Sequence, residues 1–296
     1  MAKLVPCIHS EYDTLTDVIM ASVSNFHVTE PINATQETTY SQDPPRVELQ
    51  LQEEQELVRV LEQNGVRIHW ADTLPDCPFQ SACRDIGTVI GDTFVLASMK
   101  KEIRKKEGEG VSPILAQLES RILVARNGFE GGFLEGGDVI IDNDAIFVGV
   151  SERTDELGVE FIRQNFNPRR RVIPMRLHDP FVHLDAVFNL APPNIALIYP
   201  SAFVDPPLTL LGERYTLIEI TEEEQEILCT NILALSPEKV ISDRRNSRIN
   251  GLLRDRGIQV HELDYSETTK RGGAFRCATL PLVRQKVDFL SPSTAP

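Results

Sequence analysis

The stretch Asp144-Ala-Ile-Phe-Val-Gly-Val-Ser151 has two relatives in the chain, Asp92-Thr-Phe-Val-Leu-Ala-Ser98 and Asn194-Ile-Ala-Leu-Ile-Tyr-Pro-Ser201. Each begins at a residue that favours turns, continues as an apolar run typical of a β-strand, and ends at a serine. Their first residues lie 52 and 50 positions apart. Residues 236–242 form a weaker fourth copy, and one more unit fits before Asp92. Unless this likeness is chance, a period near 50 predicts about five strand-and-helix modules around a central axis.

Two helices are predicted between these strands. Residues 45–65 carry apolar side chains among charged ones at helical spacing, and Gly65 provides a stop. Thr221 and Glu224 form a capping-box pattern, which predicts a second helix through Leu233. We see no linker that would divide the chain, so we expect one domain over residues 1–296, with a loose tail at about 285–296.

The composition indicates a folded protein with a sizeable core, since 41% of its 296 residues are apolar and 25% are charged. A net charge of −14 would repel the phosphates of nucleic acid, which is therefore not an expected partner. The five cysteines form no CxxC pair and no zinc-type spacing, which indicates free thiols in a reducing compartment. No signal peptide and no apolar run of roughly 18 residues is present, so we expect a cytoplasmic protein without a membrane partner.

A candidate nucleophile lies in Arg271-Gly-Gly-Ala-Phe-Arg-Cys277. The thiolate is the reactive form of cysteine, and an adjacent cation such as Arg276 would lower the pKa of the thiol. The glycine pair lets the backbone approach a ligand closely. The alternative for Cys277 is a buried structural thiol on an inner strand.

Two further segments carry candidate acid/base groups. In a strand over Val182–Phe188, His183 and Asp185 would project to the same face, as an acid/base group and a cation anchor. In Glu135-Gly-Gly-Asp138, a tight turn before a strand would present a carboxylate inward. Glu130 precedes a second glycine pair and competes with Glu135 for that role. The alternatives are a satisfied core histidine and a simple acidic turn.

Charged residues elsewhere give weaker signals. Asp85 follows an arginine in Cys83-Arg-Asp-Ile-Gly87, a pattern that, taken alone, a surface ion pair explains better than a binding site does. Arg153, in Ser151-Glu-Arg-Thr154, and Arg104 are each suited to bidentate binding of a carboxylate. A solvated basic face explains the lysines around Arg104 equally well.

Taken together, these segments resemble the motifs of guanidino-group-modifying enzymes, which comprise arginine deiminases, dimethylarginine dimethylaminohydrolases and amidinotransferases. The resemblance extends from about Tyr12 to Arg284. It implies a single catalytic domain with an α/β fold, the pentein α/β propeller, in which five ββαβ-type modules surround a pseudo-fivefold axis. The segments that carry it are Arg84–Gly87, Glu135–Asp138, Ser151–Thr154, His183–Asp185 and Gly272–Cys277.

The resemblance also implies roles for the candidate residues. Cys277 would be the nucleophile, His183 the general acid/base, and Glu135, which the family pattern prefers to Glu130, the carboxylate paired with the histidine. Further residues would bind substrate: Asp85 and Asp185 the guanidinium, Arg153 and Arg104 the α-carboxylate. Arg104 is placed only by its offset of 19 residues from Asp85. Where some deiminases carry an asparagine this chain has Phe79, so recognition of the α-amino end stays open.

The implied reaction is hydrolysis of the guanidinium of arginine or an N-methylated arginine through a thiouronium on Cys277, giving citrulline and ammonia or a methylamine. It needs no metal and no organic cofactor. Asp185 occupies the place of a lysine in the dimethylaminohydrolases, which favours an unmethylated guanidinium whose N–H groups need partners. Alternatives are an amidinotransferase, an arginine dihydrolase that releases ornithine, and a non-catalytic binding propeller. The expected partner is a small guanidino substrate, and a homo-oligomer is compatible with the sequence.

Overall fold

The computed structural model describes residues 3–125, 131–192 and 194–287. In this part of the chain, fifteen strands form five three-stranded sheets. The sheets are β3-β4-β5 (Gly87–Ile90, Thr93–Leu96, Arg121–Val124), β6-β7-β8 (Val139–Asp142, Ala145–Val150, Arg171–Arg176), β9-β10-β11 (Phe188–Ala191, Ile195–Ile198, Thr216–Glu219), β12-β13-β14 (Leu233–Ser236, Lys239–Asp243, Gln259–Leu263) and β15-β1-β2 (Leu280–Gln285, Thr14–Met20, Arg67–Trp70).

All five sheets have the same topology. The middle strand pairs antiparallel with the strand named first in each sheet and parallel with the third. The three sequence copies at 92–98, 144–151 and 194–201 supply the middle strands β4, β7 and β10. The weaker copy supplies β13, and β1 is the unit expected before Asp92. The 50-residue repeat is therefore confirmed at the level of the sheets.

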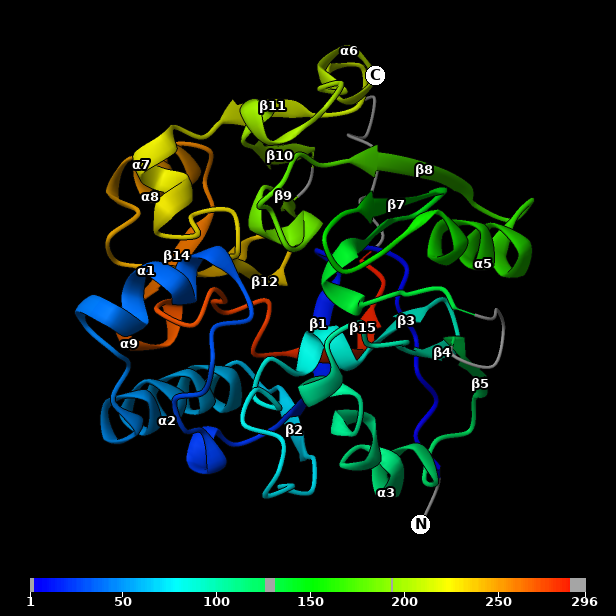
Figure 1. Cartoon of the computed structure of the whole chain (residues 1–296). Helices are drawn as coiled ribbons and strands as arrows, with labels where there is room; N and C mark the ends of the chain where they lie inside the picture. The colour runs from blue at the N-terminus through cyan, green and yellow to red at the C-terminus, as the bar shows by residue number, and fades with distance from the viewer. Residues whose placement is uncertain (1–2, 126–130, 193, 288–296) are drawn as a thin grey trace, which may run out of the picture.

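The sheet β15-β1-β2 is assembled from the two ends of the described chain. Thr14 of β1 lies opposite Gln285 of β15, while Asp17 of β1 pairs with Arg67 of β2. Figure 1 shows β1 in blue beside β15 in red. The five sheets are separate and no closed sheet forms among the described residues, so the propeller arrangement stays a prediction.

Helices cover the outside of the sheets, as Figure 1 shows for α2, α5 and α8. The helices are α1 (Ala34–Gln42), α2 (Val47–Gln63), α3 (Ser112–Leu115), α5 (Glu156–Phe166), α6 (Leu208–Gly212), α7 (Glu222–Glu226), α8 (Ser247–Arg254) and α9 (Ser266–Thr269). The helix predicted at residues 45–65 is α2, whose Leu57 and Leu61 are wholly buried one turn apart.

Two local predictions are wrong. The capping box at Thr221 and Glu224 is present, but α7 ends at Glu226 because Leu228 takes a positive φ of 57°. Leu233 therefore begins a strand instead of continuing a helix. Residues Leu184–Ala186 form a single 3₁₀ turn, η6, where an alternating strand was expected, and β9 starts only at Phe188.

Two further predictions concern the C-terminal tail and the absence of a membrane-spanning segment. Of the tail expected at about 285–296, residues 288–296 lie outside the described part, while β15 reaches Gln285. No helix in the described ranges is both long and apolar enough to cross a membrane.

Candidate active site

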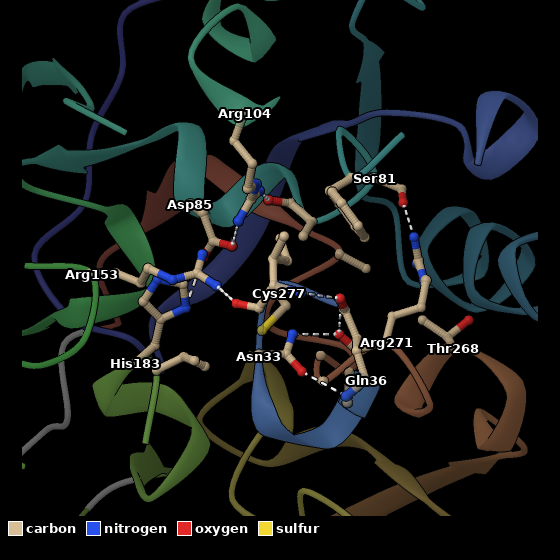
Figure 2. Close-up of a pocket in the computed structure, with 18 residues that line it drawn as sticks. Asn33, Gln36, Ser81, Asp85, Arg104, Arg153, His183, Thr268, Arg271 and Cys277 are labelled. Carbon is tan, nitrogen blue, oxygen red and sulfur yellow. Dashed lines mark hydrogen bonds and ion pairs between the residues drawn. The ribbon is translucent and has the colours of Figure 1, made fainter. Parts of the chain in front are cut away.

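A cavity of about 50 Å³ opens where the turns before several sheets meet the first helix. Figure 2 shows Asp85, His183 and Arg153 on one side of it and Ser81 and Arg271 on the other. The sulfur of the predicted nucleophile lies between the two sides. Of the seven predicted site residues, five line the cavity: Asp85, Arg104, Arg153, His183 and Cys277. The other two, Glu135 and Asp185, lie wholly buried behind His183 and Cys277.

Equivalent positions in the five sheets supply the central side chains. Each residue lies a few positions before the strand that pairs antiparallel with the middle strand of its sheet. Because the five sheets share one topology, these turns gather at corresponding ends of the sheets. The residues and strands are Asp85 before β3, Glu135 before β6, His183 before β9, Asn231 before β12 and Cys277 before β15.

His183 is held between two carboxylates. Its Nε2 lies 2.9 Å from Oε2 of Glu135, and its Nδ1 lies 3.5 Å from Oδ1 of Asp85. Burial acts to lower the pKa of the imidazole, but the charge of Asp85, the hydrogen bond with Glu135 and nearby charges raise it to about 9. The imidazole is therefore a cation at neutral pH, able to give a proton to a leaving amine.

Glu135 is the carboxylate that orients this imidazole. Its Oε1 accepts a hydrogen bond from the backbone N–H of Lys100 at 3.0 Å, which fixes the carboxylate. Burial acts to raise the pKa of Glu135, but the hydrogen bond from His183 and the guanidinium charges of Arg104 and Arg153 lower it to about 2. The competing residue, Glu130, lies outside the described residues.

Asp85 presents one bonded and one open oxygen. Its Oδ2 accepts a hydrogen bond from Nη1 of Arg104 at 2.7 Å. Its Oδ1 is buried without a hydrogen-bond partner among the described residues, apart from the ion-pair approach of His183. A buried carboxylate oxygen left open beside a cavity is suited to accept an N–H from a cationic ligand.

Arg104 is fully engaged inside the protein. Its Nε and Nη2 donate to the carboxylate of Glu107, which is wholly buried, and its Nη1 donates to Asp85. With each of its three nitrogens bonded, this guanidinium fixes Asp85 and leaves little capacity for a substrate carboxylate. This geometry favours a positioning role over the carboxylate-binding role that the offset from Asp85 had indicated.

Arg153 reaches the cavity with capacity to spare. It donates to the backbone oxygen of Ile32, and its Nη1 lies 3.6 Å from Oε2 of Glu135. Its Nε is buried without a hydrogen-bond partner in the described chain, although Oε1 of Glu152 lies 3.6 Å away. The side chain can therefore accept a further anionic partner.

Cys277 is oriented by an asparagine that the motifs did not single out. Nδ2 of Asn231 lies 3.2 Å from the sulfur, and its Oδ1 accepts the backbone N–H groups of Cys277 and Ala274. A lone asparagine carries no distinctive signal, but Asn231 stands directly before the fourth sheet. The repeat alone could therefore have identified it.

The expected lowering of the pKa of Cys277 by Arg276 is wrong. Burial first, then the charges of Asp185 and Asp85, raise the pKa of the thiol well above its ordinary value. Arg276 instead donates to Asp185 at 2.8 Å and to Glu11 at 3.0 Å. The oxygens of Asp185 lie 3.7 and 3.9 Å from the sulfur, so the thiol faces a carboxylate instead of a free cation.

Asp138, the last residue of the Glu135–Asp138 segment, fixes the histidine turn. Its Oδ1 accepts the backbone N–H of Leu184, and its Oδ2 accepts the hydroxyl of Ser151. The bond to Leu184 anchors the 3₁₀ turn η6 that replaces the expected strand. The turn still brings His183 and Asp185 to the same site, although by a different backbone path.

The cluster of Asp85, Glu135 and His183 also has donor types found in metal sites, since one ligand atom from each lies within 4.8 Å of the others. Two guanidinium groups already stand beside it, at 3.8 and 3.6 Å from Oε2 of Glu135. With the imidazolium, these groups place three positive charges against the two carboxylates. That excess of positive charge favours a hydrogen-bonded acid/base site over a metal site.

Comparison with known proteins agrees with this arrangement. The family model for eukaryotic N,N dimethylarginine dimethylhydrolase matches residues 22–284. A Bacillus subtilis protein, uncharacterized protein YkgA, is 35% identical over 93% of this chain and 94% of its own length. An arginine deiminase of Listeria welshimeri is 28% identical, and the match spans 73% of this chain but 63% of that protein.

Solved structures share the fold at lower sequence identity. The N-terminal domain of ArgZ, an arginine dihydrolase from Cyanobacteria, has a TM-score of 0.81 at 20% identity over 92% of this chain and 98% of that domain. SxtG, an amidinotransferase from Microseira wollei, has a TM-score of 0.80 at 20% identity over 95% of this chain and 98% of its own. The fold and these relatives define the class: the pentein superfamily of enzymes that modify guanidino groups. Within it, this chain belongs to the N,N dimethylarginine dimethylhydrolase family.

Proposed function

We propose that this protein is a cysteine-dependent hydrolase of the guanidinium group of arginine or an N-methylated arginine. The observation that carries the proposal is the open oxygen of Asp85 beside the cavity that Cys277 and the cationic His183 also line. A guanidinium placed there would donate to Asp85 and, beside the sulfur, to Asp185. This fixes its orientation and its central carbon over Cys277.

Substrate binding would activate the thiol. After burial, the charges of Asp185 and Asp85 are what hold the pKa of Cys277 high. A guanidinium cation between these carboxylates offsets their charge and so lowers the pKa of the thiol, which releases its proton. The reactive thiolate of Cys277 would then form only when a guanidinium is bound.

Two chemical steps follow. The thiolate forms a C–S bond to the guanidinium carbon, and the C–N bond breaks as His183 gives its proton to the departing ammonia or methylamine. The product of this step is a thiouronium on Cys277. Neutral His183 then takes a proton from water, whose oxygen attacks the same carbon. The C–S bond breaks as the remaining hydroxyl proton passes to the departing sulfur, which restores the Cys277 thiol, and the ureido product, citrulline, is released.

The substrate assay tests the proposal directly. Purified protein is incubated separately with L-arginine, N-monomethylarginine and asymmetric dimethylarginine, and products are identified by mass spectrometry, with Cys277→Ser as the control. We expect citrulline with ammonia from arginine, or with a methylamine from a methylated substrate, and no turnover by Cys277→Ser. Turnover that persists in Cys277→Ser would disprove the mechanism.

The same assay distinguishes the alternatives. Transfer of the amidino group to an added amine would mark an amidinotransferase, and ornithine with two equivalents of ammonia would mark a dihydrolase. Iodoacetamide labelling adds a second readout. A Cys277 that stays unalkylated as the pH is raised, together with no turnover, would favour the binding propeller. We also propose that the five sheets are the modules of a propeller around the site, since each supplies one of its central residues.

A further inference from the structure

We infer that Arg271 binds the carboxylate of the substrate, and that the site prefers an ω-guanidino carboxylic acid without an α-ammonium group to arginine itself. The inference rests on the proposed hydrolase and names the substrate class of its site. It concerns the end of the cavity opposite Asp85 and His183, where Ser81, Thr268 and Arg271 form the wall, as Figure 2 shows.

Arg271 is a cation without a counter-charge. Its Nη1 donates to the hydroxyl of Ser81 at 2.6 Å, and its guanidinium lies over the ring of Phe26, 5.1 Å from the ring centre. Its Nε is buried without a hydrogen-bond partner, and no carboxylate in the described ranges forms an ion pair with it. A partly buried guanidinium held only by neutral groups favours an anionic ligand.

The two glutamates whose charges act on Arg271 accept hydrogen bonds from other groups. Burial lowers the pKa of Arg271, while its interactions with Tyr265, Tyr40, Glu53 and Glu54 act in the opposite direction. Glu53 accepts the backbone N–H groups of Glu267 and Thr268. Glu54 accepts the hydroxyl of Ser22 and the backbone N–H of Val23. Neither lines the cavity.

Among the arginines of the cavity, Arg271 therefore has the most capacity for a carboxylate. Arg104 is saturated by Asp85 and Glu107. Arg153 is partly neutralised by Glu135 and Glu152, both at 3.6 Å. A carboxylate at the far end of the substrate meets Arg271 directly, while the guanidinium end reaches Asp85.

The same end offers little to an ammonium group. Among the described residues that line the cavity, Asp85 is the only acid, and it lies at the guanidinium end. Two backbone oxygens at this end of the cavity already accept hydrogen bonds. The backbone oxygen of Ile32 accepts from Arg153, and that of Arg271 accepts from the side chains of Asn33 and Gln36. The amide oxygens of Asn33 and Gln36 accept backbone N–H groups at 2.9 Å.

An α-ammonium would thus be placed beside the like charge of Arg271 with its donors poorly matched, which disfavours binding. This mismatch of charge and donors selects a guanidino acid over the corresponding amino acid.

The test compares three matched guanidines: L-arginine, its des-amino analogue 5-guanidinopentanoate, and butylguanidine, which lacks both tail charges. We measure kcat/KM for the wild type and binding to Cys277→Ser by calorimetry. We expect kcat/KM to be highest for 5-guanidinopentanoate, at least about tenfold above the value for arginine. The value for butylguanidine should be about 100-fold below that for 5-guanidinopentanoate. Each tenfold step corresponds to about 1.4 kcal/mol.

Arg271→Met then tests the assigned contact. It should lower the ratio of kcat/KM for 5-guanidinopentanoate over butylguanidine by about 100-fold. Arg59→Met, a change at an exposed arginine of α2, should leave that ratio unchanged. A tenfold preference for arginine would overturn the inference, and so would an Arg271→Met effect of equal size on both ligands.

The outcomes also separate the inference from the proposed function. Turnover with arginine preferred overturns the substrate class alone and leaves the hydrolase standing. Binding of the three guanidines to Cys277→Ser in the expected order, without turnover by the wild type, supports the substrate class and removes the hydrolase. If no guanidine binds and none is turned over, both are overturned.

Discussion

At the scale of the residue, Asn231 ties the sulfur of Cys277 to the backbone around it. The side-chain amide of Asn231 contacts the sulfur through Nδ2, and its Oδ1 accepts hydrogen bonds from the backbone N–H groups of Ala274 and Cys277. A donor at this distance stabilises the thiolate more than the thiol, because hydrogen bonds to charged groups are the stronger ones. In the proposed mechanism, the amide would therefore lower the barrier to attack by the sulfur without entering the reaction.

Asn231→Ala should lower kcat/KM by about 10- to 100-fold, the equivalent of one hydrogen bond to a charged group. It should also raise the pH at which iodoacetamide alkylates Cys277. Asn250→Ala is the matched control, since Asn250 is equally buried and bonds to Asp243 and Glu262 instead. If the pH dependence of alkylation is the same in Asn231→Ala as in the wild type, Asn231 only holds the backbone around Cys277 and does not stabilise the thiolate.

His183 makes the stability of the protein depend on pH. Its pKa rises from an ordinary value of 6.5 to about 9 in the folded protein, so protonation favours the folded state. That contribution is fully present below pH 6.5 and is lost as the pH rises through 9. It amounts to about 3 kcal/mol at most.

Chemical denaturation of the wild type and of His183→Gln at several pH values measures this contribution. The difference in the free energy of unfolding should shrink between pH 6.5 and 9 and level off above it. In the folded wild type, the His183 imidazole proton resonance should titrate near pH 9. A titration near 6.5 would contradict the network of Asp85 and Glu135 around the ring.

At the scale of the element, the site is carried by turns too short to be predicted. The 3₁₀ turns η2 (Cys83–Ile86), η5 (Gly136–Asp138) and η6 (Leu184–Ala186) hold three or four residues each. Such turns have no hydrophobic period, so the pattern at His183 predicts a strand instead. The predictions of the long helix α2 and of the middle strands β4, β7 and β10, which are continuous apolar runs, are confirmed.

The turn η5 requires a glycine at position 137. A Cβ there would lie 2.7 Å from Oδ1 of Asp85 and 2.9 Å from the ring of His183. Gly137→Ala should therefore displace Asp85, proposed to hold the guanidinium, and His183, proposed to protonate the departing amine, and lower kcat/KM by about 100-fold. Wild-type activity in this variant would contradict the close packing.

Gly251→Ala provides the control for that substitution. Gly251 lies inside α8, and a Cβ there would have no atom within 4 Å. It should raise the free energy of unfolding by about 0.5–1 kcal/mol, since alanine is the better helix former, and leave kcat/KM unchanged.

At the scale of the whole molecule, the repeat of about 50 residues predicts about five modules, while the motifs and the resemblance that they carry predict the site. Five corresponding turns supply Asp85, Glu135, His183, Asn231 and Cys277. The sequence motifs reveal four of these because their residue types are distinctive. The partners of the arginines were not predictable, because the contacts of Arg104 with Asp85 and of Arg276 with Glu11 depend on how different turns meet.

The sheet built from both chain ends should be essential to stability. Leu282 of β15 is wholly buried in the core that β3, β4 and β6 share. Leu282→Ala should cost about 2–5 kcal/mol of the free energy of unfolding, the usual range for a buried leucine. Val5→Ala, at a half-exposed valine, should change it by less than about 0.5 kcal/mol. A small loss at Leu282 would show that β15 pairs only loosely with β1.

The pairing of β15 with β1 has a consequence for biosynthesis. Cys277 stands three residues before β15, whose partner is the first strand of the chain. While the ribosome still encloses residues 280–285, the other four sheets can form, but Cys277 has no fixed place. The nascent polypeptide therefore lacks the assembled site around Cys277, and so does a truncated translation product that ends before β15.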